Sequence, residues 1–211
     1  MIYELRTYTL KPGTQAAVAD NSADLGRDIR GNNYGHLEGY WVTEIGALNQ
    51  VMHMWSFASL DERARLRAEL ATNQRWVNEY LPALLPNLVR QEVRLMNAFL
   101  PVQPPSTTGN VYELRSYRTR PTRARAWAAA FTKAMPARSR YSTCSGAWIC
   151  DAGQPNEVCH IWAYPDLNAR AAARAGAVAD PDWQAFLGEA VGYIEEMSST
   201  IMLPWKHSPM Q

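Results

Sequence analysis

The stretch IYELRTYTL at residues 2–10 returns as VYELRSYRT at residues 111–119. Further landmarks follow in the same order, with GYW at 39–41 corresponding to GAW at 146–148 and VMHMW at 51–55 corresponding to VCHIW at 158–162. The offset falls from 109 residues at the first motif to 107 at the last, which a two-residue deletion explains. Because self-similarity of this kind marks a repeat architecture, the chain is a tandem duplication of one unit.

Each unit is predicted to run in the order βαββαβ. Residues 2–10 alternate and are rich in Tyr, Thr and Leu, as in a strand, and Lys11-Pro12-Gly13 ends that strand with a turn. The other elements predicted for the first unit are a helix at 14–30, a hairpin at 37–45 and 50–57, helical segments through 70 and from 73 to 86, and a strand at 88–97. The second unit repeats this plan and closes with a strand near 194–203.

A βαββαβ unit is the ferredoxin-like motif, an α+β fold with a four-stranded antiparallel sheet and both helices on one face. The other face of each sheet is bare. We therefore expect the two sheets to pack face to face as an α/β barrel, so that neither half folds alone. The run of Pro, Ser and Thr after Leu100 predicts a linker at 102–109, between a first unit at 1–101 and a second at 110–211.

Composition excludes several classes of function. With 21 Lys and Arg against 20 Asp and Glu, the net charge is +1, and no global field favours nucleic acid or a membrane surface. No apolar run reaches the roughly 18 residues of a membrane-spanning helix. The three cysteines, Cys144, Cys150 and Cys159, suit a reducing compartment, so a soluble, cytoplasmic protein is expected. The sequence is compatible with a homodimer but does not require one.

The segments YELRTYTLKPG, GYW, HMW and HIW, together with the two-unit layout, resemble the NIPSNAP family, which belongs to the dimeric α/β-barrel superfamily. The resemblance covers nearly the whole chain and implies a ferredoxin-like barrel. It implies little chemistry, because bacterial members of the family have no settled activity, while animal members are tied to mitochondria and mitophagy. The wider superfamily includes cofactor-free monooxygenases, isomerases and haem enzymes.

Alternation along the strands separates an apolar face from a polar one. Tyr3, Leu5, Met52 and Met54 share the first face, as do their copies in the second unit, and this face is assigned to the helices. The other face is then expected to point into the barrel and to form a polar pocket. Its candidate acid or base residues are His53 and His160, and its candidate ligand-binding residues are Glu4, Arg6, Tyr8, Trp55, Glu113, Arg115, Tyr117 and Trp162.

Two functional hypotheses stay open on this pattern. In the first, the barrel interior binds a small aromatic or anionic molecule and, if it supports catalysis, does so as a cofactor-independent monooxygenase or isomerase. In the second, the protein is a non-catalytic scaffold, and the Glu-Arg pairs and the histidines are structural. The hairpin register does not decide which way Trp41 and Trp148 point.

No cofactor or metal site is predicted. The sequence contains no Gly-rich phosphate loop, Ser nucleophile elbow or CxxC motif, and no His/Cys cluster supplies the three or four ligands that zinc or iron needs. The arginines at 63, 65 and 67 and at 170 and 174 are interpreted as solvated helix faces.

Overall fold

The eight strands form one closed antiparallel barrel in the order β1-β3-β2-β8-β5-β7-β6-β4. The computed structural model describes residues 1–211. The strands are β1 (Ile2–Leu10), β2 (His36–Ile45), β3 (Gln50–Phe57), β4 (Leu88–Leu100), β5 (Val111–Thr119), β6 (Thr143–Ala152), β7 (Glu157–Tyr164) and β8 (Ile194–Pro204). Each half contributes a sheet of the ferredoxin-like order 4-1-3-2, as the βαββαβ pattern predicted.

The two sheets are joined at both edges by strands from opposite halves. Strand β2 pairs with β8, where Trp41 faces Pro204, and β4 pairs with β6, where Ala98 faces Trp148. These two pairings leave no free sheet edge. The predicted α/β barrel is therefore confirmed, with hydrogen bonds as well as packing between its halves.

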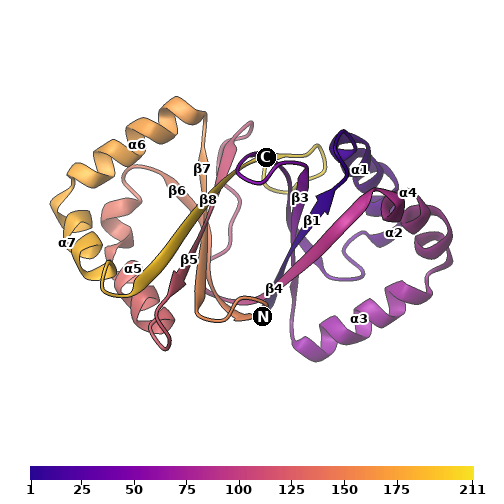
Figure 1. Cartoon of the computed structure of the whole chain (residues 1–211), viewed down its shortest axis with the longest axis horizontal. Coiled ribbons are helices and arrows are strands. Elements are labelled where there is room, and N and C mark those ends of the chain that lie inside the picture. The colour runs from indigo at the N-terminus through magenta and orange to yellow at the C-terminus, as the bar shows by residue number, and fades with distance from the viewer.

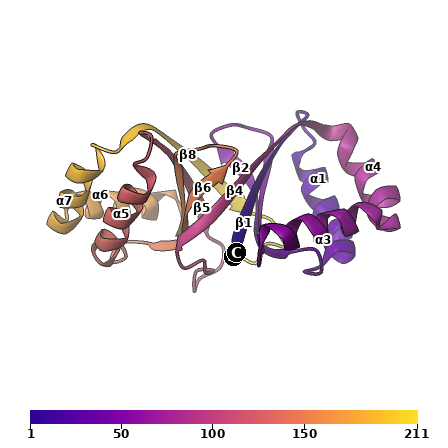
Figure 2. The ribbon, with the colours of Figure 1, turned by 90° about the horizontal axis from the view of Figure 1, so that it is seen from below.

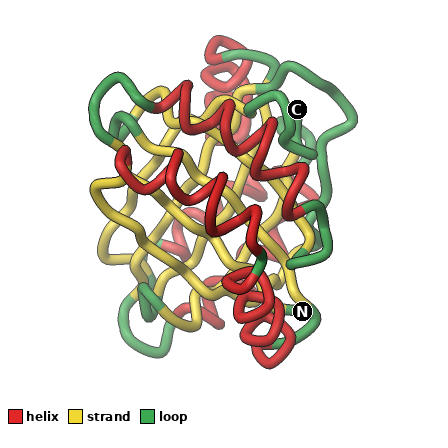
Figure 3. The backbone as a smooth tube through the Cα atoms, turned by 90° about the vertical axis from the view of Figure 1, so that its right-hand side faces the viewer, coloured by secondary structure: helices red, strands yellow, loops and turns green.

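The helices cover the outer faces of the two sheets, one group on each side of the molecule (Figures 1 and 2). Seen from the side of the first half, the helices lie in front of the strands (Figure 3). The first half contains α1 (Gln15–Asn21), η1 (Ser22–Gly26), α2 (Arg27–Arg30), α3 (Leu60–Thr72), η2 (Trp76–Tyr80), α4 (Leu81–Leu84) and η3 (Leu85–Asn87). The second half contains α5 (Ala124–Arg138), α6 (Leu167–Ala179) and α7 (Pro181–Ala190).

The barrel interior is filled by apolar side chains from both halves. The core cluster of 15 buried residues includes Tyr3 and Leu5 of β1 together with Tyr112 and Leu114 of β5. Trp41 and Trp148 also belong to this cluster and are fully buried, which settles their direction. Each tryptophan ring lies over the glycine two residues before it, where a Cβ atom would approach ring carbons within 2.1 Å at Gly39 and 2.5 Å at Gly146.

The expected assignment of the two strand faces is wrong. Tyr3, Leu5, Met52 and Met54 point into the barrel, and the polar face points outward to the helices. The reason is physical: alternation fixes which residues share a face but not which face points inward. A closed interior without water favours the apolar face, whereas arginines on the helices can reach and neutralise a carboxylate on the outer face.

Two π-helical turns distinguish the helices of the first half from those of the second. η1 lies between α1 and α2, and η2 precedes α4, whereas α5 and α7 are regular α-helices. A π-helical turn accommodates one extra residue. Accordingly, the offset between the halves falls from 109 at Tyr3 and Tyr112 to 108 at Arg30 and Arg138, on the far side of η1.

Candidate functional site

The carboxylate of Glu4 lies at the centre of an arginine cluster outside the barrel. It accepts a hydrogen bond from Arg6 Nη1 at 3.0 Å, contacts Arg63 of α3, and lies 3.6 Å from Arg67 Nη1 of the same helix. The side chain of Glu4 is fully buried. Burial alone would raise its pKa, but the charges of Arg6, Arg63 and Arg67 outweigh burial and lower it.

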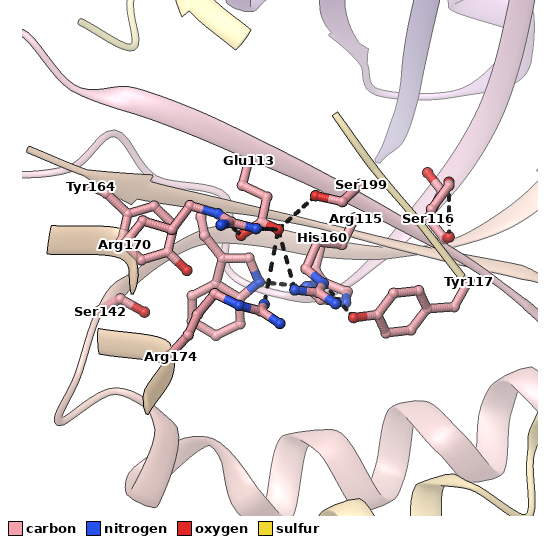
Figure 4. A network of polar contacts seen from close by, with 12 residues as sticks. Glu113, Arg115, Ser116, Tyr117, Ser142, His160, Tyr164, Arg170, Arg174 and Ser199 are labelled. Atoms are coloured by element: carbon pink, nitrogen blue, oxygen red, sulfur yellow. Dashed lines mark hydrogen bonds and ion pairs between the residues drawn. The ribbon is translucent and has the colours of Figure 1, made fainter. Parts of the chain in front are cut away.

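The second half repeats this cluster around Glu113 (Figure 4). Glu113 Oε1 accepts hydrogen bonds from Arg170 Nη2 at 2.7 Å, from Arg115 Nη1 at 3.2 Å and from the Ser199 hydroxyl at 2.6 Å, and Arg174 Nη1 lies 3.9 Å away. Although burial acts to raise the pKa of Glu113, these hydrogen bonds and charges lower it to about 2. Both carboxylates are therefore ionised at neutral pH.

The helix arginines correct a sequence-based interpretation. Arg63 and Arg67 of α3, and Arg170 and Arg174 of α6, turn inward to the two carboxylates instead of lying on solvated faces. Only Arg65 follows the prediction, because its side chain is 60% exposed and pairs with Glu69 on the same helix. The repeat of the Arg pairs at the same offset in both halves is the sequence signal that marks them.

Each histidine is held in one tautomer by the tryptophan two residues later. Trp55 Nε1 donates a hydrogen bond to His53 Nδ1 at 2.7 Å, and Trp162 Nε1 donates to His160 Nδ1 at 2.5 Å. A neutral imidazole with Nδ1 as acceptor carries its proton on Nε2. Burial lowers the pKa of both histidines well below the usual range, with Arg6 and Arg30 adding to this at His53 and Arg115 at His160. Both rings are therefore neutral hydrogen-bond donors at Nε2.

In each half a buried arginine, at the end of α2 or of α5, stacks on that tryptophan. The Arg30 guanidinium lies 3.3 Å from the ring centroid of Trp55, and that of Arg138 lies 4.1 Å from the ring centroid of Trp162. Both arginines are about 95% buried. Arg30 donates to the Tyr34 carbonyl through Nη2, but its Nε has no partner. Each half therefore contains an arginine that stacks on a tryptophan, which in turn donates a hydrogen bond to a histidine.

A cavity of about 330 Å³ lies between the sheet and the helices of the first half. Its buried floor includes Tyr8, His53 and Trp55, and the exposed residues Leu85 and Gln91 mark its mouth. The remaining lining residues are Arg6, Ser22, Gly26, Arg27, Arg30, Leu37, Tyr40, Arg67, Leu70, Ala71, Trp76, Tyr80, Leu81, Leu84 and His207. Four arginines and two histidines thus face this space, and no Asp or Glu does.

One lining residue, His207, comes from the segment that follows β8. Its ring lies 4.4 Å from that of Tyr40. The segment is fixed to the first half by Lys206, which pairs with Asp20 and Asp24, and by Ser208, whose hydroxyl accepts from the Tyr40 amide. Burial lowers the pKa of His207 to about 4, so this ring is also neutral at pH 7.

The second half has a corresponding cavity of about 250 Å³. It is lined by the equivalents Arg115, Tyr117, Arg138, His160, Trp162 and Arg174, with Trp127, Phe131, Ala177, Val178, Trp183, Phe186, Leu187, Ala190, Ile194 and Met197. Here too no Asp or Glu lines the wall.

Comparison with known proteins bears on both halves at once. A NIPSNAP family model matches the chain twice, at residues 3–101 and 112–209. The chain belongs to the NIPSNAP family. Protein NipSnap homolog 3B of Mus musculus is 30% identical over 214 residues, covering 99% of this chain and 85% of that protein, and the Homo sapiens homolog 3B is 29% identical over 218 residues with the same coverage. A putative monooxygenase from Lactobacillus acidophilus NCFM has a similar fold, with a TM-score of 0.69 and 11% identity over 96% of this chain and 93% of that one.

In this NIPSNAP chain the ten predicted site residues fall into two separate groups of five. Glu4, Arg6, Tyr8, His53 and Trp55 lie together in the first half, and their copies lie together in the second. The two histidines line different cavities and do not converge across the barrel. The two glutamates lie behind the arginines and do not line either cavity.

The structure of this NIPSNAP protein adds residues that sequence reasoning missed. Arg30, Arg138 and His207 were not singled out, although the first two occupy matching places in the repeat. No group of three or more His, Cys, Asp or Glu side chains could hold a metal ion. No helix has both the length and the apolar character to cross a membrane. The three cysteines are free thiols.

Proposed function

We propose that this NIPSNAP protein binds a small anionic molecule with an apolar or aromatic body in the cavity between the sheet and the helices of the first half. The location differs from the barrel interior expected from sequence, since that space is filled by the apolar core. The single observation that carries the proposal is the composition of the cavity wall: four arginines, two neutral histidines and no carboxylate.

The local charge favours an anion. Glu4 pairs with two of the lining arginines, Arg6 and Arg67, and is also shared with Arg63. The other two lining arginines, Arg27 and Arg30, donate hydrogen bonds to carbonyl and amide oxygens instead of carboxylates, and Nε of Arg30 has no partner. Uncompensated buried cations are unfavourable, and a carboxylate or similar anion would neutralise them through charge-assisted hydrogen bonds.

The shape and lining of the cavity favour an apolar or aromatic body on that anion. Tyr40 stacks on His53 with ring centroids 5.5 Å apart, and Trp76 and Tyr80 stack on each other at 4.2 Å. Such walls receive a flat, apolar group, while a few polar groups fix its orientation. A volume of about 330 Å³ suits a small molecule.

The protonation states favour binding over proton abstraction. His53 offers Nε2 as a donor, because Trp55 occupies the lone pair of Nδ1. Glu4 is sequestered by arginines, so neither group is a free base. The site is therefore suited to hold and stabilise negative charge.

Thermal unfolding with a matched pair of probes tests this function. Phenylacetate should raise the melting temperature of the protein, whereas the uncharged phenylacetamide should not, because only the anion can form ion pairs with the lining arginines. Native mass spectrometry of the purified protein should in addition reveal any ligand retained from the cell. Equal effects of the acid and the amide, or no effect of either, would contradict the proposal.

Two arginines of α3 provide a matched pair of variants for the same measurement. Arg67→Gln removes a lining cation and should weaken phenylacetate binding by about tenfold, the value of one charge-assisted hydrogen bond. Arg65→Gln changes a solvated arginine on the same helix and should leave binding unchanged. Loss of binding in both variants would point to a general field instead of a site.

A further inference from the structure

We propose that the second half carries a second ligand site, in the cavity lined by Arg115, Arg138 and Arg174, which takes an anion with a wholly hydrocarbon body. The first cavity differs in accepting an anion whose body carries a further oxygen. This inference rests on the proposed function for the charge of the ligand, and it adds a second site and a rule for what each site accepts.

Three of the four arginines that line the first cavity have counterparts in the second, and Arg27 has none. Arg115 and Arg138 occupy the places of Arg6 and Arg30 beside the equivalent carboxylate and tryptophan. Arg174 occupies the place of Arg67. Its side chain is 38% exposed, and its Nη1 lies 3.9 Å from Glu113 Oε1. With no acidic residue in the lining, the second cavity also favours an anion.

Among the polar groups that line only the first cavity, Ser22 and Tyr80 have aromatic counterparts in the second. In the first half the hydroxyl groups of Ser22 and Tyr80 lie 3.0 Å apart in a hydrogen bond. In the second half Phe131 stands at the place of Ser22, and Phe186 packs against it with ring centroids 5.7 Å apart, as Tyr80 packs on Ser22. A polar wall in the first cavity is therefore replaced by an apolar wall in the second.

Phe131 also closes off the imidazole of the second half. Its ring lies 5.1 Å from that of His160, and Trp127 stacks on the same imidazole at 5.7 Å. His160 Nε2 is sealed from solvent without any hydrogen-bond partner, whereas Nε2 of His53 is not sealed. The imidazole donor is thus within reach of a ligand only in the first cavity.

The ligand classes follow from the cost of leaving polar atoms without partners. An oxygen on the ligand body can accept from His53 Nε2 in the first cavity. In the second cavity the same oxygen, placed against Phe131 and Phe186, would lose its water without gaining a hydrogen bond, which is unfavourable. Trp127, Phe131 and Phe186 favour a hydrocarbon body there.

Indole NMR signals distinguish the two cavities in the intact protein. Trp55 and Trp76 line the first cavity, and Trp127, Trp162 and Trp183 line the second, so each site has its own reporters after assignment by Trp→Phe variants. Phenylacetate, an anion with a hydrocarbon body, should shift both groups of signals. Benzoylformate, which carries a ketone in place of the methylene, should favour the first cavity by about fivefold, the value of one neutral hydrogen bond.

The titration with phenylacetate separates the two proposals. A response of Trp55 and Trp76 alone overturns the second site and leaves the proposed function of the first cavity standing. A response of the second group alone supports the second site and contradicts the proposed function. Silence of all five signals overturns both.

Reciprocal variants test the rule for the ligand body. Phe131→Ser should expose the imidazole of His160 and raise the preference of the second cavity for benzoylformate by about fivefold, and Ser22→Phe should remove that preference from the first. If Phe131→Ser does not fold, the rule is still tested by Ser22→Phe and by the titrations of the wild-type protein with phenylacetate and benzoylformate. Unchanged preference in a folded variant overturns the rule.

Discussion

At the scale of single residues, the decisive feature is that one buried carboxylate in each half is the counter-ion of several arginines. Glu4 has no exposed side-chain surface and contacts three guanidinium groups, two of them from α3. Removing one partner of a buried ion pair leaves uncompensated charge, which costs more than the pair contributes when intact. The carboxylate therefore also orients the arginines that face the cavity.

Glu4→Gln should lower the free energy of unfolding by about 3–5 kcal/mol, because Arg6, Arg63 and Arg67 would be left without their counter-ion. Urea denaturation at neutral pH measures this change. Glu69→Gln is the control, since Glu69 forms an exposed pair with Arg65 that contributes less than about 1 kcal/mol. Similar losses in the two variants would show that the buried cluster has no special role.

The equivalent carboxylate in the second half predicts a pH dependence. The pKa of Glu113 is lowered from 4.5 to about 2 in the folded protein, so its contribution is fully present above pH 4.5 and is lost as the pH falls to about 2. Allowing for screening by solvent, this contribution is of the order of 2 kcal/mol. Urea unfolding at a series of pH values should show a smaller acid-induced loss for Glu113→Gln than for the wild type. The same dependence of stability on pH in the variant and the wild type would contradict the lowered pKa of Glu113.

At the scale of elements, the two π-helical turns shape the first cavity. η1 and η2 face each other through Gly26 and Tyr80, and a Cβ atom added to Gly26 would lie 2.7 Å from Tyr80 Cε2. Both residues line the cavity. The second half has no such turns, and its cavity is correspondingly smaller.

Gly26→Ala should destabilise the protein by about 1–3 kcal/mol through overpacking against Tyr80, despite the better helix propensity of alanine. Gly188→Ala in α7 should stabilise it by about 0.5–1 kcal/mol, because nothing lies within 4 Å of the added Cβ atom. Thermal and urea unfolding of the two variants give the comparison. A change of the same sign in both would rule out close contact between η1 and η2.

At the scale of the whole molecule, each half depends on the other for its core and for its sheet edges. The interior cluster draws from both sheets, and β4 and β8 each bridge from one half to the other. An isolated half would expose one apolar sheet face and two unpaired edges, which favours aggregation.

Residues 1–103 expressed alone should therefore not give a soluble, well-dispersed monomer. Size-exclusion chromatography and proton NMR check this. Co-expression with residues 104–211 is the matched control and should restore a folded complex of both fragments. A well-dispersed monomeric spectrum of the first fragment alone would show that the shared core is not required.

The fold could be predicted from sequence further than the site. The repeat of IYELRTYTL, with alternation and turn residues, was sufficient for the βαββαβ order and the barrel. The polar set was also identified correctly as one face, but its direction depends on which face the closed interior accepts, which alternation does not encode. Arg30 and His207 reach the first cavity from a helix end and from the segment after β8, contacts that no local pattern predicts.

The pairing of edge strands between the halves has an evolutionary consequence. Joined in this way, the two units have the arrangement of a two-fold symmetric dimer whose subunits have become one polypeptide. In a dimer of identical chains every substitution occurs in both subunits, so both cavities must change together. Fusion removes that constraint, and one copy can hold serine at 22 while the other holds phenylalanine at 131. The duplication thus allowed one inherited pocket to diverge into two.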